Sequence, residues 1–336
     1  LYKGDMPASM GGRLASVLDI RMKDGNSKEF VATGGIGTLS SRLTLESPII
    51  KDKCSFMVSG RRTYVDLFFP LFKNDDLKSS TLYFYDLNAK INYTLNDKNR
   101  IFVSGYFGRD IFGNGDMGFG FGNRTFTTRW NHIFGNKLFM NTTLLRSNYS
   151  YFLESDSNDA NAFKWESDMK ETSFKVDFNL MANAHHNLKF GVSTSLLSFN
   201  PGVVNGTDEA SFIDQWKIPK SHALEHGIYL MNEQKVSKFI LKYGIRLSVF
   251  QNMGKSKLLK LDDNYKVIDS VRYKQGEVYN TYINPEPRIG VTYIINDKSS
   301  IKASYSHSVQ YIQQASNSQA GNPLDVWFPA SPNIKP

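Results

Sequence analysis

The stretch TLYFYDLNAKINYTL, residues 81–95, decides the fold because its side chains alternate along its whole length. One face carries apolar residues, namely Tyr83, Tyr85, Leu87, Ala89, Ile91, Tyr93 and Leu95. The other face is mostly polar, with Phe84, Asp86, Asn88, Lys90, Asn92 and Thr94. A period of two residues is that of a β-strand. The stretch exceeds the roughly 5–6 residues of an ordinary strand, so it predicts a long strand with one apolar face.

The same alternation recurs along the chain. It is found in TSFKVDFNLMA (172–182), NLKFGVSTSLLSF (187–199), FILKYGIRLSVF (239–250) and SIKASYSHSV (300–309). Strands of a soluble β-sandwich are shorter and are separated by turn signals every ~8–12 residues. A run of about ten alternating residues is the length that crosses a bilayer at a tilt. The repeated pattern therefore favours membrane-spanning strands over a sandwich.

The connections between these runs alternate in length. Short polar turns are predicted at 96–99, 135–137, 183–187, 235–238 and 296–299, and long connections at 63–80, 110–122, 154–165, 199–220 and 253–279. Such alternation places all short turns at one end of a barrel and all long loops at the other. Aromatic residues lie beside the short turns, as in an interfacial girdle: Tyr93, Phe134, Phe139, Phe190, Phe239 and Tyr293. We predict an all-β, antiparallel transmembrane β-barrel with about twelve strands after Glu29.

Composition is consistent with this fold and narrows the function. The 336 residues carry a net charge of +8, but Lys and Arg are dispersed, whereas nucleic-acid-binding proteins concentrate them in a patch. Mean hydropathy is −0.38, and no apolar run approaches the ~18 residues of a transmembrane helix. The single cysteine, Cys54, excludes an internal disulfide. Nucleic acid is therefore not an expected partner.

Three short motifs have weak chemical signals. GNGDMG (113–118) has dinucleotide-binding spacing but lacks the buried strand and the helix of that motif, so we expect a surface loop. The acidic run 154–159 lacks the Gly and distal Glu of a calcium loop, and His185 and His186 lack further ligands. No nucleophile with a base can be assembled. We expect no enzyme, no metal and no cofactor, and calcium at 154–159 stays open.

The N-terminal sequence MPASMGGRLASVLDIRMKDGN (6–26) resembles the last segment of the plug domain in TonB-dependent outer-membrane receptors. In that family a Gly-Gly-Arg loop leads into a Val-Leu-Asp-Ile strand, matched here by Gly11, Gly12, Arg13, Asp19 and Arg21. The segments TGGIGTLSSRLTLESPI (33–49) and SFMVSGRRTYVDLF (55–68) resemble the first barrel hairpin of the Bacteroidota branch, and SYSHSVQYIQQASNS (304–318) and DVWFPAS (325–331) are also similar to these receptors.

The resemblance implies a plug inside a 22-stranded barrel. Residues 1–27 would be the end of the plug and its linker, and residues 28–336 the N-terminal part of the barrel, so the chain would be a fragment holding about half of the wall.

Charged residues on the polar faces are predicted to face the lumen, because a charge on the lipid side costs ~2–4 kcal/mol at the bilayer midplane. They are Asp86, Lys90, Lys175, Asp177, Lys189, Lys242, Arg246, Arg288 and Lys302. Arg13 and Arg21 are candidates to pair with wall carboxylates such as Asp86 or Asp177; the alternative is that both face lumen water.

Aromatic residues in the predicted long loops are candidates for a ligand vestibule, since they stack on sugars or flat chelates. They are Phe119, Phe121, Trp165, Trp216 and Trp327. Structural packing of the loops explains them equally well, and the sequence leaves both explanations open.

The resemblance implies TonB-dependent import of a scarce nutrient (a siderophore, vitamin, oligosaccharide or peptide) across the outer membrane of a Gram-negative bacterium. Expected partners are a TonB-type complex acting through a plug segment outside this chain, outer-membrane lipid or lipopolysaccharide, the nutrient and, in one version, a surface lipoprotein. A passive porin and a structural, adhesion or secretion-linked barrel are the alternatives.

Overall fold

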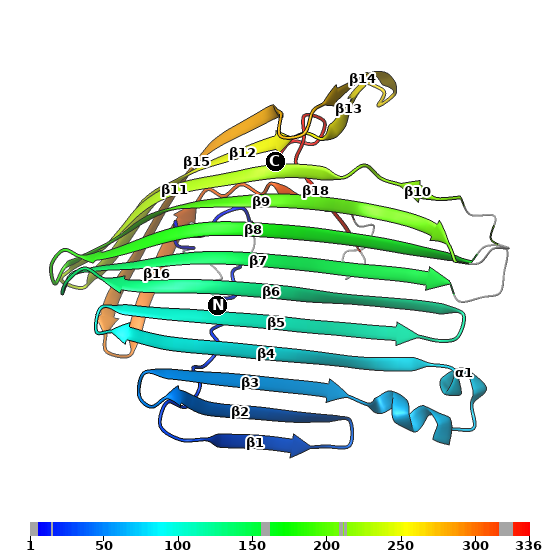
Figure 1. Ribbon diagram of the computed structural model, residues 1–336. Helices are drawn as coiled ribbons and strands as arrows, with labels where there is room; N and C mark the ends of the chain where they lie inside the picture. The colour runs from blue at the N-terminus through cyan, green and yellow to red at the C-terminus, as the bar shows by residue number, and fades with distance from the viewer. Residues whose placement is uncertain (1–5, 15, 156–161, 208–210, 212–213, 316–324) are drawn as a thin grey trace.

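The structure is a computed structural model that describes residues 6–14, 16–155, 162–207, 211, 214–315 and 325–336 (Figure 1). A 14-stranded antiparallel sheet dominates it, with β10 attached beside β9 and the remaining strands in the order β1-β2-β3-β4-β5-β6-β7-β8-β9-β11-β12-β15-β16. Every neighbour along this path is paired antiparallel. Within the described residues, β1 and β16 are not paired with each other, so the sheet is a partial barrel rather than a closed one.

The sheet is built from long strands. Their bounds are β1 Val31–Ile36, β2 Ser40–Ile50, β3 Cys54–Thr63, β4 Thr81–Asn96, β5 Asn99–Gly113, β6 Met117–Ile133, β7 Leu138–Ser155, β8 Phe163–Met181, β9 His186–Gly206, β10 Trp216–Lys217, β11 Ser221–Val236, β12 Phe239–Met253, β15 Val278–Asn296 and β16 Ser299–Ser306. The alternating stretch quoted first is therefore one strand, β4. The all-β antiparallel prediction is confirmed, and the wall contains slightly more strands than the predicted twelve.

Small elements decorate one end of the wall. The 3-10 helix η1 (Val65–Leu71) and the short helix α1 (Asp75–Lys78) join β3 to β4, and the hairpin of β13 (Ser256–Leu261) and β14 (Val267–Tyr273) joins β12 to β15. A second hairpin, β17 (Ile312–Ala315) and β18 (Val326–Pro329), follows β16. Among the described helices, neither is long and apolar enough to cross a membrane.

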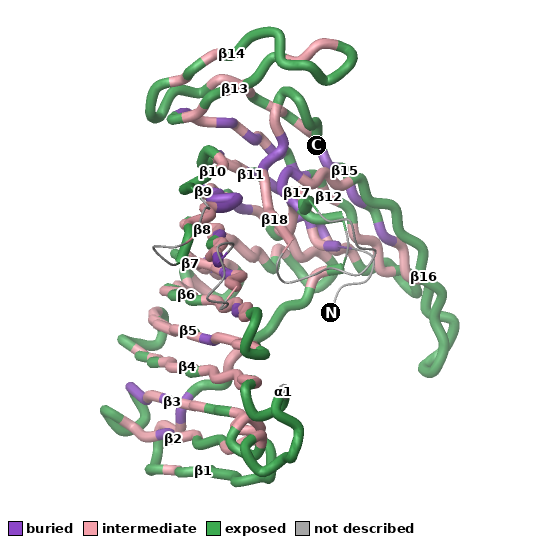
Figure 2. The backbone as a smooth tube through the Cα atoms, turned by 90° about the vertical axis from the view of Figure 1, so that its right-hand side faces the viewer, coloured by how far each residue is buried: buried purple, intermediate pink, exposed green. Residues whose placement is uncertain are grey.

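The wall is curved, and its concave side holds two segments (Figure 2). One is residues 6–27, which we call the N-terminal segment, and the other contains β17 and β18. Contacts define this inner face: the ammonium of Lys90 binds the carbonyl of Met22 at 2.8 Å, and the hydroxyl of Ser55 binds the carbonyl of Gly25 at 2.7 Å. Residues directly opposite on neighbouring strands share a face, so these contacts assign both faces of the whole sheet.

Several predicted connections differ from the structure. Residues 110–122 are not a long loop, because β5 and β6 continue to Gly113 and from Met117. Likewise β7 continues to Ser155 and β9 to Gly206, and the connection at 253–279 contains the hairpin of β13 and β14. The strands extend because their backbone ladder stays paired beyond the apolar alternation. The five predicted short turns lie at one end of the sheet. The connections 37–39 and 114–116 at the other end are short as well, so the strict alternation of short and long connections does not hold.

The outer face carries the apolar residues of the alternating runs. Aromatic rings cluster near its short-turn end: Phe178 stacks on Phe190 with centroids 5.0 Å apart, and Phe239 contacts Tyr293 at 4.9 Å. Phe139 differs from the other predicted girdle residues, because its partner Asn179 lies on the inner face opposite Lys189. The Phe139 ring therefore points to the inner face, unlike the other predicted girdle residues.

The buried core of the described residues lies on the inner face. It consists of Leu197, Phe199, Ala223, Phe250, Tyr311, Ile312 and Ala330, with Met169, Tyr282, Val309 and Trp327 packed against it. The Phe250 and Tyr311 rings stack with centroids 4.7 Å apart. The Asn252 side chain donates to the carbonyl of Ala330 at 2.7 Å. The hairpin of β17 and β18 is thus fixed to the inside of β9, β11 and β12 by apolar burial and hydrogen bonds.

Candidate functional site: the inner face and the N-terminal segment

All nine charged residues predicted to face the lumen lie on the inner face. Their cross-strand partners place them there: Asp177 is opposite Gly191, Lys242 is opposite Glu233 and Gly290, and Lys302 is opposite Thr292. Lys175 lies two positions before Asp177 and contacts it at 3.2 Å. Strand alternation alone therefore places these charges on the side of the wall that holds the N-terminal segment.

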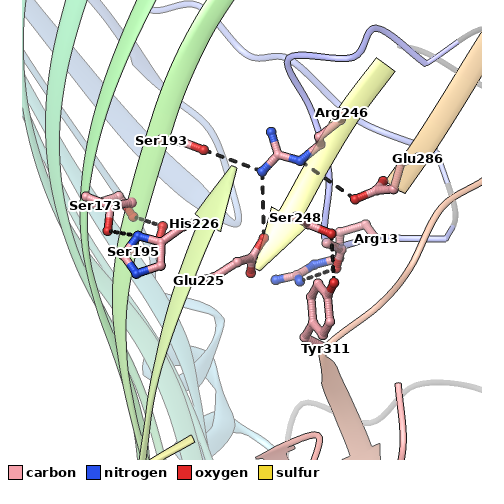
Figure 3. Close-up of polar contacts among 12 residues, drawn as sticks. Arg13, Ser173, Ser193, Ser195, Glu225, His226, Arg246, Ser248, Glu286 and Tyr311 are labelled. Atoms are coloured by element: carbon pink, nitrogen blue, oxygen red, sulfur yellow. Dashed lines mark hydrogen bonds and ion pairs between the residues drawn. The ribbon is translucent and has the colours of Figure 1, made fainter. Parts of the chain in front are cut away.

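Arg246 lies at the centre of a buried ionic cluster on β11, β12 and β15 (Figure 3). Its side chain is only 5% exposed, and it lies 3.9 Å from a carboxylate oxygen of Glu225 and 3.8 Å from one of Glu286. It also donates to the hydroxyl of Ser193 at 3.4 Å. Arg288 completes the cluster with a 2.9 Å bond to Glu286, whose side chain is fully buried. Two cations and two carboxylates thus compensate one another away from solvent.

Two glycines make room for the Arg246 side chain. A Cβ added at Gly11 of the N-terminal segment, or at Gly227 of β11, would overlap its guanidinium group. Gly12 has φ +72, in the left-handed region, and a Cβ there would lie 3.0 Å from a Glu225 carboxylate oxygen. The Gly-Gly pair of the sequence is therefore the place where the N-terminal segment passes directly over the ionic cluster.

Wall cations hold the N-terminal segment through its backbone carbonyls. Arg288 donates to the carbonyls of Met6 and Pro7 at 3.2 and 2.6 Å, and Lys175 donates to that of Ser9 at 3.2 Å. Farther along, Lys90 binds the Asp24 carboxylate at 2.6 Å in addition to the carbonyl of Met22. Because the acceptors are mostly backbone, these contacts fix the path of the segment rather than select its side chains.

Neither Arg13 nor Arg21 forms an ion pair with Asp86 or Asp177, the two wall carboxylates named as candidates. Asp86 is bound by Arg61 of the neighbouring strand at 2.7 Å, and Asp177 is bound by Lys175 and by the hydroxyl of Tyr229. Arg13 donates to the carbonyl of Gly12 at 2.7 Å, and Arg21, which is 83% exposed, contacts Asp19 at 3.4 Å. The wall thus satisfies Asp86 and Asp177 itself. The segment cation that does pair with a wall carboxylate is Lys23, which binds Glu46 of β2.

Two polar cavities lie between the N-terminal segment and the wall. One, of about 660 Å³, runs along residues 19–24 and faces Lys90, Tyr106 and Arg129. The other, of about 430 Å³, is lined by Asp19 and Arg21 together with charged wall residues, namely Lys175, Asp177, Lys189, Glu233 and Lys242. Both are lined by charges of both signs, which suits water and polar groups rather than an apolar ligand.

The five aromatic residues predicted for long loops all lie in strands. Phe119 and Phe121 are in β6, Trp165 is in β8, and Trp216 and Trp327 are in the short strands β10 and β18. Phe119 contacts Phe112 of β5, and Trp165 contacts Tyr151 of β7.

Their packing differs from one residue to the next. A Cβ at Gly202 would overlap the Trp165 ring, so this ring covers its neighbour β9. Trp327 packs on the inner core, whereas Trp216 is 60% exposed. For Phe119, Trp165 and Trp327, packing against the wall or the inner core accounts for the ring.

Tyr311 was not singled out by the sequence, yet it links the hairpin of β17 and β18 to the wall. Its hydroxyl contacts that of Ser248 at 2.7 Å and accepts from the Asn284 side chain at 2.8 Å. Burial raises the pKa of the Tyr311 hydroxyl above its usual range, so it stays neutral at physiological pH. Glu225 and Glu286 were also missed. Their signal is present in the sequence, because each is an acidic residue at an inner position of an alternating strand.

Within the described residues, no three His, Cys, Asp or Glu side chains converge as a metal site would require. His185 lies in the turn before β9, where its backbone N–H bonds the Asn183 side chain at 2.9 Å. Glu154, at the end of β7, lies 3.5 Å from Lys164. The remainder of the acidic run, 156–159, lies outside the described residues.

Comparison with known proteins identifies the wall. The sequence model of the family described as "TonB dependent receptor-like, beta-barrel" matches residues 63–336. No curated protein sequence matches the chain. Among solved structures, the copper transporter OprC has a TM-score of 0.66 at 10% identity over 92% of this chain and 50% of its own.

Two further solved structures have a similar fold. The ferripyoverdine receptor of the outer membrane of Pseudomonas aeruginosa gives a TM-score of 0.63 at 14% identity over 88% of this chain and 44% of its own. The ferric preacinetobactin receptor BauA from Acinetobacter baumannii gives 0.61 at 11% identity over 91% and 51%. The chain spans about half the length of these proteins, and at such identities the likeness concerns the fold. The family match covers most of the chain, and the protein therefore belongs to the TonB-dependent receptor-like β-barrel family.

Proposed function

We infer that this chain forms part of a TonB-dependent importer that takes up a scarce nutrient across the outer membrane of a Gram-negative bacterium. In this proposal residues 1–27 are the end of the plug and its linker, residues 28–336 form barrel wall, and a TonB-type complex pulls on the plug. The long-connection end of the wall faces outward and receives the ligand. No reaction on the ligand is proposed.

One observation carries this proposal: a separate segment lies inside the wall and is held there at several points. Arg288, Lys175 and Lys90 bind the N-terminal segment through groups that can be exchanged for water. Polar contacts of this kind, bordered by polar cavities, fix a segment yet allow it to move at modest cost, because each net hydrogen bond from a charged donor contributes only about 1.5–3 kcal/mol. A passive porin has no need of such a segment.

The nutrient is a siderophore, a vitamin, an oligosaccharide or a peptide. The similar solved structures include a copper transporter and ferric-siderophore receptors, which favours a metal or a metal chelate as the first candidate to test. A surface lipoprotein partner would favour an oligosaccharide or a peptide instead. A passive porin, or a structural, adhesion or secretion-linked barrel, remains the alternative.

The test compares cells with and without the full-length receptor on media limited for one nutrient at a time: ferric siderophore, copper, cobalamin, oligosaccharide or peptide. We expect growth on one of them to need both the receptor and TonB, and a protonophore to abolish uptake. Uptake that persists without TonB, with ion conductance in planar bilayers, would establish a porin. Unchanged uptake with lost surface attachment would establish a structural role.

A further inference from the structure

Asp110 of β5 lies on the inner face, toward the long-connection end of the wall (Figure 1). Its diagonal neighbour Asp86 on β4 is bound by Arg61 at 2.7 Å. Among the described residues, no cation lies within ion-pair distance of the Asp110 carboxylate itself, although Arg61 and Asp86 are near enough to interact with it electrostatically. Two carboxylates thus share one close cation, and this part of the inner face has an excess negative charge.

Aromatic rings flank Asp110 on both neighbouring strands. Phe84 of β4 and Phe121 of β6 are directly opposite it. Residues directly opposite one another share a face and have Cβ atoms about 4.5–5.5 Å apart. The Phe84 ring already holds one cation, because the Arg61 guanidinium lies over it at 4.9 Å. The carboxylate is therefore bordered by ring faces of a kind that attracts positive charge.

Two tyrosine hydroxyls approach the same carboxylate. A Cβ added at Gly108 would overlap the hydroxyl oxygen of Tyr106. Gly108 lies between Tyr106 and Asp110 on one face of β5, so the Tyr106 hydroxyl is directed toward Asp110. The Asp110 carboxylate is also close enough to interact electrostatically with the hydroxyls of both Tyr106 and Tyr149 of β7. One carboxylate and two hydroxyls thus converge from two strands.

Two further groups border this region. Asp325, directly before β18, interacts electrostatically with Tyr149 and adds a third carboxylate. Tyr151, directly opposite Phe121, is only 4% exposed, and its hydroxyl has no hydrogen-bond partner in the described part of the chain. A buried hydroxyl without a partner is unfavourable. This part of the wall therefore offers a polar group that a bound molecule can satisfy.

The chemistry of these side chains indicates an organic cation. A primary ammonium group has three N–H donors and no acceptor, which matches one carboxylate and two hydroxyls. A metal ion fits less well, because the phenyl rings supply no ligand atoms, and no three His, Cys, Asp or Glu side chains converge in the residues that the structure describes. An anionic chelate would be repelled by the excess negative charge.

We propose that Asp110, Tyr106, Tyr149, Phe84 and Phe121, which we call the ammonium site, bind a primary ammonium group of the imported nutrient, and that this nutrient is a peptide. The inference rests on the proposed function and deepens it by choosing among the four nutrient classes. Of these classes, an unmodified peptide always carries such a group at its N-terminus. A lysine side chain supplies the same group.

The test measures binding of pentapeptides to the full-length receptor in mild detergent by isothermal titration calorimetry. The probes are AAKAA, with two ammonium groups, N-acetyl-AAKAA, with the lysine ammonium only, AAQAA, with the N-terminal ammonium only, and N-acetyl-AAQAA, with none. Asp110→Asn is compared with the matched control Asp97→Asn, which removes the same charge from a short turn.

We expect AAKAA to bind about tenfold or more weakly to Asp110→Asn than to wild type, because a charge-assisted contact is lost. Asp97→Asn should bind like wild type, and N-acetyl-AAQAA should bind wild type as weakly as AAKAA binds Asp110→Asn. Whichever singly charged peptide keeps its affinity identifies the N-terminus or the lysine side chain as the source of the ammonium.

Three outcomes would overturn the proposal: no detectable binding of AAKAA to wild type, equal binding of AAKAA and N-acetyl-AAQAA, or equal binding of AAKAA by Asp110→Asn and wild type. A glucosamine tetramer that binds as tightly as AAKAA would overturn the assignment to a peptide. Heat-modified mobility on gels verifies folding. If Asp110→Asn does not fold, raising NaCl from about 50 to about 500 mM should weaken binding of AAKAA to wild type severalfold, and unchanged affinity would contradict the site.

Binding and import are measured separately, so the two proposals can fail independently. TonB-dependent uptake of another nutrient, without binding of peptide, would overturn the ammonium site alone. Binding of peptide that depends on Asp110, together with uptake that does not need TonB, would overturn active import alone.

Discussion

At the scale of single residues, the packing of the inner face depends on glycines that leave room for a neighbouring side chain. Arg246 fits between two strands and the N-terminal segment only because Gly227 and Gly11 have no Cβ. A packed charge of this kind does not tolerate a methyl group easily, since an overfilled site typically costs 1–3 kcal/mol. The glycines therefore matter for the space they leave rather than for backbone flexibility.

Gly227→Ala is expected to lower the free energy of unfolding of the full-length receptor in detergent by about 1–3 kcal/mol. Gly105→Ala is the matched control on another strand, because an added Cβ there meets only the Thr125 carbonyl oxygen, at an ordinary 3.8 Å. It should change stability by less than about 0.5 kcal/mol. Urea unfolding followed by gel mobility measures both. Equal stability of the two variants would contradict the overlap with Arg246.

Removing one charged residue of the ionic cluster is expected to lower the free energy of unfolding more than the added methyl group of Gly227→Ala. Arg288→Met leaves Glu286, which is fully buried, without its 2.9 Å partner and removes both carbonyl contacts to the N-terminal segment. Breaking a buried pair from one side costs about 3–5 kcal/mol. Arg21→Met, at an exposed position, should be nearly neutral. The same unfolding experiment decides, and a loss below about 1 kcal/mol for Arg288→Met would show that the cluster is not needed.

At the scale of elements, the hairpin of β17 and β18 is attached to the wall by one hydroxyl as well as by ring stacking. Tyr311→Phe keeps the stack on Phe250 but removes the contacts to Ser248 and Asn284. Leaving such buried groups unsatisfied costs about 1–3 kcal/mol. Because this hairpin is short, the loss is expected to appear as local opening rather than global unfolding.

Hydrogen exchange of residues 309–315 and 325–330 should accelerate roughly 5- to 150-fold in Tyr311→Phe, as about 1–3 kcal/mol of local opening implies. The β12 amides should be unchanged. Tyr265→Phe, on an exposed turn of the hairpin of β13 and β14, is the control and should match wild type. Acceleration spread over β12 and β15 as well would instead mean that Tyr311 stabilises the wall itself.

The sequence predicts strands well where they alternate and poorly where they do not. Residues 81–95 and 239–250 fall within β4 and β12. The pattern of connection lengths predicts a long connection over 110–122, which includes Phe119 and Phe121, but these residues lie in β6. This strand is held by the backbone ladder to β5, which leaves no alternation in the side chains. A strand continues for as long as its backbone pairs with that of its neighbour. The sequence of one segment alone therefore does not reveal where its strand ends.

The same limit applies to the site. The alternation is enough to predict that Lys90, Arg246 and Arg288 lie on the inner face. It does not predict which residues of the N-terminal segment each of them contacts. The partner of Asp86 is Arg61, directly opposite on β3, and only the register identifies it, whereas the partner of Asp177 is Lys175, two residues earlier on the same strand. Sequence reasoning thus predicts the face of a residue in the wall, whereas a contact across the lumen depends on the curvature of the whole sheet.

At the scale of the whole molecule, the two ends of the wall should face opposite compartments. A cysteine introduced as Asp269→Cys, in the hairpin of β13 and β14, is expected to react with a membrane-impermeant maleimide in intact cells. Lys98→Cys, in a short turn, should react only after the outer membrane is permeabilised. The native Cys54 is buried and should stay unlabelled in both cases. The reverse labelling pattern would invert the proposed orientation.

The length of the strands has a consequence for the resistance of the wall to proteases. β9 runs over 21 residues, about twice the roughly 9–11 that a tilted crossing needs. In the proposed outer-membrane setting, the excess would stand beyond the bilayer as hydrogen-bonded sheet, because β9 stays paired with β8 as far as Gly206. Proteases need an extended, unpaired backbone to cut. In the proposed orientation, the part of the wall outside the bilayer is therefore expected to resist proteolysis, with cleavage at the connections between strands.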